Sequence, residues 1–166
     1  MPGRGVLLDI AAFRNEEILE AATVITLADF EAAEARQGVR VGEGDILLFR
    51  TGLIRHFTVH GSVERYWKGE PGIDLSCVGG RHERGVAAIA SDNWSIEAIP
   101  PNPEKHMLPV HCVLIRDLGM TLGEIFDLES LAEDCAEDGV WEFFFTAPVL
   151  KVVNGVGSPI TPLAFK

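Results

Sequence analysis

The chain has 166 residues, of which 47% are hydrophobic and 23% charged, and its 25 acidic against 14 basic residues give a net charge of −11. This length and apolar content suit a single folded domain over residues 1–166 and exclude a disordered or fibrous protein. The negative charge repels phosphate backbones and anionic lipid surfaces, so we expect neither nucleic acid nor a membrane as partner.

The three cysteines, Cys77, Cys112 and Cys135, are odd in number, widely spaced and without a CxxC pair. This pattern is typical of buried free thiols in a reducing compartment. The first residues, MPGRGVLLDI, lack the basic segment and long apolar stretch of a secretory signal. We therefore expect a cytoplasmic protein.

The first half of the chain alternates between strand and helix patterns. Gly5 to Ile10 is a short apolar run that predicts a buried strand. Thr26 and Asp29 form a capping pattern ahead of a helix from about Leu27 to Gln37, which Gly38 ends. Asp45 to Thr51 has the length and apolar content of an internal strand.

The middle of the chain begins with a polar and aromatic stretch, His56 to Gly72, which we interpret as a long functional or interface loop. Asp74 or Ser76 then caps a predicted helix that runs to Arg84. Two consecutive glycines, Gly79 and Gly80, cost helix stability, so we expect this helix to be shortened or loosened.

The last part of the chain continues the alternation, which indicates the α/β class. Val86 to Ser91 predicts a central strand that ends at Asp92. The later predicted elements are a rigid loop over Pro100 to Lys105, a helix over Leu108 to Leu118, a short strand over Leu122 to Phe126, an acidic helix over Leu128 to Asp138, and a strand over Trp141 to Val153 with Pro148 at a bulge or an edge.

His111 and Glu124 are the first candidates for a functional pair. They are too far apart for one helical face, so they meet only if the helix ends near Gly119 and the chain turns back. An imidazole and a carboxylate from consecutive elements suit Zn²⁺ or Mn²⁺, which accept mixed nitrogen and oxygen ligands. A lone His beside an apolar stripe is also commonly a core residue, and the spacing leaves that alternative open.

The sequence resembles the bacterial cyclase family, which contains metal-dependent kynurenine formamidases and isatin hydrolases. The resemblance lies in GRGVLLDIAAFR, ITLADFEAAEARQGVRVGEGDILLFRTG, HERGVAAIASDNWSIEAIP, LPVHCVLIRDLGMTLGEIFDLESLAEDCAEDGVWEFFFTAPVLKV and GVGSPITPLAF. It covers nearly the whole chain and implies a swivelling β/β/α fold that lacks its N-terminal part here. It also implies a divalent metal, Zn or Mn, and hydrolysis of a formamide or small amide.

The resemblance implies that His111 and Glu124 are the later metal ligands. The family's earlier ligands come from a His-x-Gly-Thr-His-x-Asp motif that precedes the strand at Gly5 to Ile10, and the 166 residues do not contain it. Three explanations follow: an N-terminal portion was lost, the reading frame begins inside a longer ancestral gene, or another chain supplies the ligands.

His56 and His60 repeat the spacing of that motif, but they lack its Gly and Thr, and Ser62 stands where its Asp would be. A solvated loop explains this pair more simply than a metal site does.

Asp92 and Trp94 are the remaining candidates. The carboxyl ends of strands open into the crevices of α/β sheets, and the resemblance supports a position near the substrate for both residues. We therefore name Asp92 and Glu124 as catalytic candidates and Trp94 as a substrate contact. The alternative is a turn Asp followed by a packing Trp.

The sequence thus predicts a metal-dependent hydrolase of a formamide or small amide, of the arylformamidase class. The alternative is a catalytically incomplete domain that keeps the fold for oligomerisation or ligand binding. Missing an early strand would expose apolar edges, so we expect a homo-oligomer, either a dimer or a tetramer.

Overall fold

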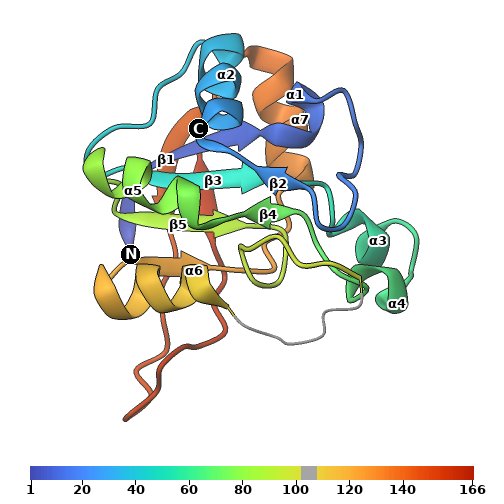
Figure 1. Cartoon of the computed structure of the whole chain (residues 1–166). Helices are drawn as coiled ribbons and strands as arrows, with labels where there is room; N and C mark the ends of the chain where they lie inside the picture. Colours follow the sequence, from blue (N-terminus) through green and yellow to red (C-terminus); the bar gives the residue numbers. More distant parts are fainter. Residues whose placement is uncertain (102–107) are drawn as a thin grey trace.

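The computed structural model describes residues 1–101 and 108–166, and it describes their side chains except at positions 80–83. A six-stranded sheet forms its centre, with strand order β6-β5-β3-β1-β7-β8 (Figure 1). The strands are β1 (Pro2–Asp9), β3 (Ile46–Arg50), β5 (Ala88–Ser91), β6 (Thr121–Gly123), β7 (Glu142–Thr146) and β8 (Leu163–Phe165). Neighbours from β6 to β1 pair in parallel, and β7 and β8 continue the sheet in antiparallel pairs.

Helices and a second, two-stranded sheet surround this centre. The small sheet pairs β2 (Val24–Ile25) with β4 (Gly72–Ile73) in parallel. The helices are α1 (Ile10–Phe13), α2 (Leu27–Gln37), α3 (Arg55–Thr58), α4 (Val63–Tyr66), α5 (Leu75–Glu83), α6 (Pro109–His111), the π-helix η1 (Cys112–Asp117) and α7 (Glu129–Asp138).

The two faces of the sheet carry separate hydrophobic cores, because successive side chains of a strand point to opposite faces. Val6 and Leu8 of β1 pack with residues of α2, α5, α6 and η1 on one face. Leu7 packs on the other face with Ala132 and Cys135 of α7. All five residues of β3 are buried: the apolar run from Ile46 to Phe49 suits a central strand, and Arg50 at its end is paired with Asp9 and Glu129. The predicted α/β class and the strands at Gly5 to Ile10, Asp45 to Thr51 and Val86 to Ser91 are confirmed.

The helix after Thr26 is also confirmed, together with its ends. The Thr26 side chain accepts the Asp29 amide N–H at 3.2 Å, and the Asp29 carboxylate accepts the Thr26 amide N–H at 2.7 Å. At the other end Gly38 has φ +68°, which only glycine adopts without strain. The acidic helix predicted from Leu128 to Asp138 is present as α7.

Three predictions about local structure were wrong. The segment from His56 to Gly72 is not one long loop, because most of α3, all of α4 and the start of β4 lie in it. Helix α5 runs through Gly79 without shortening. The strand predicted to Val153 ends at Thr146, and Pro148, which has no N–H to donate, lies just beyond it.

The helix predicted from Leu108 to Leu118 consists of three α-helical residues followed by the wider π-helix η1. Val110 and Leu114 are buried, as expected. A spacing of four residues falls between one turn of an α-helix and one turn of a π-helix, so the apolar stripe could not distinguish them. Strand β6 is likewise shorter than predicted and ends at Gly123. Of the predicted loop Pro100 to Lys105, residues 102–105 lie outside the described residues.

Cys77 and Cys135 are buried free thiols, as predicted, whereas Cys112 is exposed. Val110 of α6 and Leu114 of η1 occupy the buried side of this helical segment and leave Cys112 facing solvent. No helix among residues 1–101 and 108–166 is long and apolar enough to cross a bilayer.

Candidate active site

The candidate site lies where the parallel strands β5 and β6 end. Because these strands run in the same direction, their carboxyl ends meet at one edge of the sheet. The Ile125 amide N–H donates to the Asn93 carbonyl at 2.8 Å, and the Phe126 amide N–H donates to the Ser91 carbonyl at 3.1 Å. The segments that carry Asp92 and Glu124 are therefore tied to each other by main-chain hydrogen bonds.

His111 and Glu124 lie in contact at this edge. The π-helix ends at Asp117, and Gly119, with φ +67°, reverses the chain into β6. This turn brings the Nε2 atom of His111 to 2.7 Å from Oε1 of Glu124. The chain reversal near Gly119 that the sequence required is present, and it joins the two residues into one site.

Gly123 allows Glu124 to reach this position. A Cβ atom at residue 123 would lie 2.7 Å from the ring of Phe126 and 2.9 Å from the Cβ of Ala90. Both distances are too short for carbon atoms in contact, so a larger residue would push β6 away from β5. The absence of a side chain at Gly123 thus lets β6, which leads directly into Glu124, pair closely with β5.

Glu97 is a third member of the site that the sequence did not reveal. Its Oε1 atom lies 2.9 Å from the Nδ1 atom of His111 and accepts the His111 amide N–H at 3.0 Å. Its Oε2 atom accepts the Val110 amide N–H at 3.0 Å. Glu97 lies in the segment HERGVAAIASDNWSIEAIP, which carries part of the family resemblance, but no ligand spacing connects it with His111, so it was not named as a candidate.

The two carboxylates give His111 an unusual charge state. Its hydrogen bond with Glu124, followed by that with Glu97, raises the pKa of the imidazole to about 9, although desolvation opposes this effect. His111 is therefore an imidazolium at neutral pH when no metal is bound. A cation that binds Nε2 must displace this proton.

Asp92 lies in the protein interior rather than at an open surface. The amide N–H and the hydroxyl of Thr51 both donate to its Oδ1 atom at 2.8 Å. Its Oδ2 atom has no hydrogen-bond partner among the described residues. Burial raises the pKa of this carboxyl. The catalytic role of Asp92 stays a prediction, and its bonds to Thr51 connect the ends of β3 and β5.

Trp94 packs against a small cluster of buried residues, Leu53, Ile54 and Tyr66. Its ring centroid lies 5.5 Å from that of Trp67, whose side chain is half exposed. Trp94 Nε1 is buried and has no partner in the part of the chain that the structure describes. An aromatic wall thus borders the segment that adjoins Glu124, which is compatible with the predicted substrate contact.

Glu70 is a fully buried carboxyl beneath this wall, and sequence reasoning missed it too. Its Oε2 atom accepts the Trp94 amide N–H at 2.6 Å, and its Oε1 atom is bonded to the Ser95 hydroxyl. Burial raises the pKa of Glu70 to about 8, although these two hydrogen bonds lower it. Glu70 is therefore mostly neutral at pH 7.

A buried ionic network adjoins this region at the ends of β1 and β3. Arg50 donates to Asp9 Oδ1 at 3.0 Å and to both oxygens of Glu129, the first residue of α7, at 2.7 and 3.0 Å. Arg55 also donates to Glu129, at 2.7 Å. Two arginines thus face two carboxylates, and the network fixes α7 to the strand ends.

The donor set fits part of a divalent-metal site. His111 and Glu124 offer the nitrogen and oxygen ligands that Zn²⁺ and Mn²⁺ accept, from two elements that converge. Within residues 1–101 and 108–166, no group of three or more His, Cys, Asp and Glu side chains is placed to hold a metal ion. His56 and His60 lie apart from this pair, on and just after α3, with ring centroids 5.9 Å apart.

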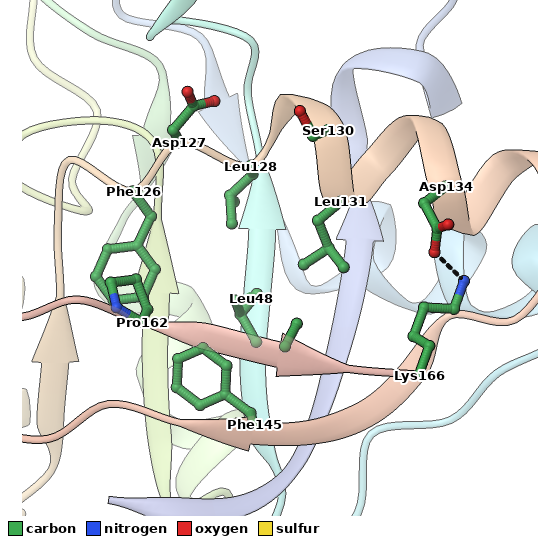
Figure 2. Close-up of a pocket in the computed structure, with 11 residues that line it drawn as sticks. Leu48, Phe126, Asp127, Leu128, Ser130, Leu131, Asp134, Phe145, Pro162 and Lys166 are labelled. Atoms are coloured by element: carbon green, nitrogen blue, oxygen red, sulfur yellow. Dashed lines mark ion pairs between the residues drawn. The ribbon is translucent and has the colours of Figure 1, made fainter.

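A cavity of about 480 Å³ lies on the opposite side of the sheet, between α7 and β8 (Figure 2). In the close-up, Leu48, Phe126, Leu131 and Phe145 point into it, and Lys166 forms an ion pair with Asp134 at its rim. Neither His111 nor Glu124 lines this cavity. It is therefore a separate feature of the face that α7 covers.

Comparison with known proteins places the chain in a family. The model of the Cyclase family matches residues 1–98, which is more than half of the chain, and the chain therefore belongs to the Cyclase family. A solved structure described as a novel cyclase superposes with a TM-score of 0.88 and is 42% identical, over 99% of this chain and 54% of that one. The resemblance inferred from sequence is confirmed.

Two isatin hydrolases share the fold at lower identity. Isatin hydrolase A from Ralstonia solanacearum has a TM-score of 0.74 and 22% identity, over 98% of this chain and 59% of that one. Isatin hydrolase A from Labrenzia aggregata, bound to benzyl benzoate, has a TM-score of 0.73 and 19% identity, over 98% and 60%. The chain thus spans a little over half the length of these structures. No curated protein matches it by sequence.

Proposed function

We propose that this chain supplies the His111 and Glu124 ligands of a divalent-metal site that hydrolyses a formamide or small amide. The observation that carries the proposal is the 2.7 Å contact between His111 Nε2 and Glu124 Oε1 at the carboxyl ends of the strands. The choice of an amide substrate is supported by the isatin hydrolases among the solved relatives, since isatin is a cyclic amide. We retain Zn²⁺ and Mn²⁺ as candidate ions.

Catalytic zinc sites commonly have three protein ligands, so a site with only His111 and Glu124 should bind a metal weakly. We propose that the further ligands come from polypeptide outside these 166 residues, either continuous with this chain or on a separate subunit. The free thiols Cys77 and Cys135 support a reducing, cytoplasmic location.

The roles of the side chains follow from their positions. A bound divalent ion would polarise the substrate carbonyl and lower the pKa of a water molecule. His111 and Glu124 would hold that ion, while Trp94 and Trp67 would line the path of the substrate. We assign proton transfer to the leaving nitrogen to Asp92, because its Oδ2 atom has no partner among the described residues and burial raises its pKa.

The test is calorimetric titration of the chain with ZnCl₂ and with MnCl₂, followed by formanilide hydrolysis with each metal. We expect one ion per chain, and at least tenfold weaker binding after His111→Asn or Glu124→Gln, since each removes one of two ligands. His60→Asn and Glu64→Gln, on exposed residues, are the matched controls and should bind metal like the wild type. Equal binding by all five proteins would contradict the proposal.

The alternative function is a non-catalytic domain of the same family that acts in oligomerisation or ligand binding. It is favoured by one observation: His111 and Glu124 bond to each other, and in the described part of the chain no group of three or more His, Cys, Asp and Glu side chains is placed to hold a metal ion. Metal binding that depends on both residues, without turnover of formanilide even after the rest of the polypeptide is supplied, would support this alternative.

A further inference from the structure

Glu97 is enclosed by the residues that it contacts. Its side chain is only 5% exposed, and each of its two oxygens already has a partner on Val110 or His111. Both carboxylate oxygens are therefore committed, and Glu97 acts on the site only through the neighbouring residues.

One oxygen of Glu97 fixes both the backbone and the ring of His111. Oε1 accepts the amide N–H of His111 at 3.0 Å and lies 2.9 Å from Nδ1 of the same residue. The first contact fixes the main chain of α6 at His111, and the second fixes the rotation of the imidazole about its Cβ–Cγ bond. With Nδ1 turned toward Glu97, the other nitrogen, Nε2, faces Glu124.

The contact with Glu97 favours the tautomer of the neutral ring that carries its proton on Nδ1. A neutral imidazole carries one N–H, and a carboxylate beside Nδ1 keeps the proton there, since a carboxylate accepts hydrogen bonds and cannot donate one. Glu124 favours a proton on Nε2 in the same way, so the Nε2 lone pair becomes available when a cation displaces that proton beside Glu124, and the remaining proton is then held on Nδ1 by Glu97. Carboxylates that orient a metal-binding histidine in this way commonly change metal affinity by 10- to 100-fold when they are removed.

We propose that Glu97 is the positioning residue of the site, holding the Nδ1–H of His111 so that the Nε2 lone pair is presented beside Glu124 to a divalent cation. The proposal rests on the proposed function for the identity of the ligand. The orientation of the ring can be measured without any metal, so the two proposals can fail separately.

The first experiment measures metal affinity. Glutamine has one acceptor oxygen where Glu97 uses two, so Glu97→Gln cannot serve the Val110 amide and the His111 ring together. We expect it to weaken Zn²⁺ binding in the calorimetric titration at least tenfold, and Glu97→Asp, which keeps the charge, to recover part of the loss.

The matched control is Glu34→Gln. Glu34, a residue of α2, is also buried and accepts a backbone N–H, that of Val41 at 3.1 Å, but its side-chain partner is Arg84. This variant should lose stability and keep its Zn²⁺ affinity. If Glu97→Gln weakens binding no more than Glu34→Gln does, a positioning role is contradicted.

The second experiment reads the tautomer by ¹⁵N NMR of the imidazole in the metal-free chain, above the pH at which His111 becomes neutral. In Glu124→Ala, which removes the partner of Nε2, we expect the proton on Nδ1. In Glu124→Ala with Glu97→Gln we expect a shift toward the Nε2–H form. A predominant Nε2–H form in Glu124→Ala alone would overturn the proposal, even if Glu97→Gln does not fold. Absent metal binding with the expected tautomers would overturn only the proposed function.

Discussion

The three glutamates around the site differ in their partners. Glu97 and Glu124 both bond to the ring of His111, whereas Glu70 bonds to a hydroxyl and an amide, which carry no charge. A carboxylate loses its hydration free energy on burial, and neutral hydrogen-bond donors make up only part of that loss. Glu70 therefore keeps its proton, and its raised pKa makes the stability of the fold depend on pH.

We predict that Glu70→Gln stabilises the protein at alkaline pH. The folded-state pKa of Glu70 is about 8, above its ordinary value of 4.5, so the folded protein binds more protons than the unfolded chain between these values. The free energy of unfolding therefore falls as pH rises through this window. Glutamine does not titrate, so the variant should exceed the wild type by roughly 2–4 kcal/mol at pH 8.5.

Urea denaturation at pH 4.5, 6.5 and 8.5 checks this prediction. The two proteins should differ least at pH 4.5, where Glu70 is protonated in the folded state. Glu133→Gln, on the exposed side of α7, is the control and should follow the wild type at each pH. A constant difference between Glu70→Gln and wild type across the range would show that Glu70 does not titrate as described.

The site residues that could be predicted from the sequence belong to recognisable patterns. His111 and Glu124 stand in a family motif and required only a chain reversal at Gly119, which the structure contains. Glu70 and Glu97 were missed because their importance comes from burial and from partners distant in the chain. Contacts of this kind depend on how loops pack, and no local pattern encodes them.

At the level of elements, helix α5 carries a glycine that is not needed for its conformation. Gly79 lies within the helix, and a Cβ atom there would meet nothing within 4 Å. We predict that Gly79→Ala raises the free energy of unfolding by about 0.5–1 kcal/mol, because alanine loses less backbone entropy on forming helix.

Gly38 provides the matched comparison for Gly79. It has equal space around it, but φ is +68° in the cap of α2. Gly38→Ala should therefore lower the free energy of unfolding by about 1 kcal/mol, since alanine is strained in that conformation. Urea denaturation of both variants measures the difference. Stabilisation by both, or by neither, would contradict this account of the two helices.

Elements with strong local signals were predicted well. The capping pair Thr26 and Asp29 and the terminal Gly38 defined α2 almost to the residue. The π-helix η1 and the early end of β7 were not foreseen, because both depend on packing against distant segments. An apolar run such as WEFFFTAPVLKVV is equally compatible with a long strand and with a short strand followed by an exposed arm.

That arm is the main feature at the scale of the whole molecule. Residues 147–162 form no helix or strand, and Figure 1 shows this part of the chain reaching away from the sheet. It carries the exposed side chains of Val149, Leu150, Val152, Val153 and Val156. Contiguous apolar residues in water favour association with another apolar surface.

We predict that the 166-residue chain self-associates, as a dimer or a tetramer, through this arm. Light scattering coupled to size exclusion at micromolar concentrations should give a mass above that of one chain. Val153→Asp with Val156→Asp should shift it toward the monomer, whereas Val59→Asp, on an exposed residue after α3, should not. A clean monomer for the unaltered chain would contradict the prediction.

The position of β1 has a consequence for how the molecule folds. Gly5 pairs with Ile46 on one side and with Phe143 on the other, so the middle of the sheet joins segments from nearly opposite ends of the chain. Bringing such distant segments together has a large loop-closure entropy, and proteins rich in contacts of this kind fold slowly. The second core, on the α7 side, includes Phe143 and Phe145 of β7 and therefore cannot be completed until this last pairing is made. Until then the apolar side chains of β1 and β3 on that face lack the cover of β7, and we expect a longer time in this state to favour aggregation during refolding.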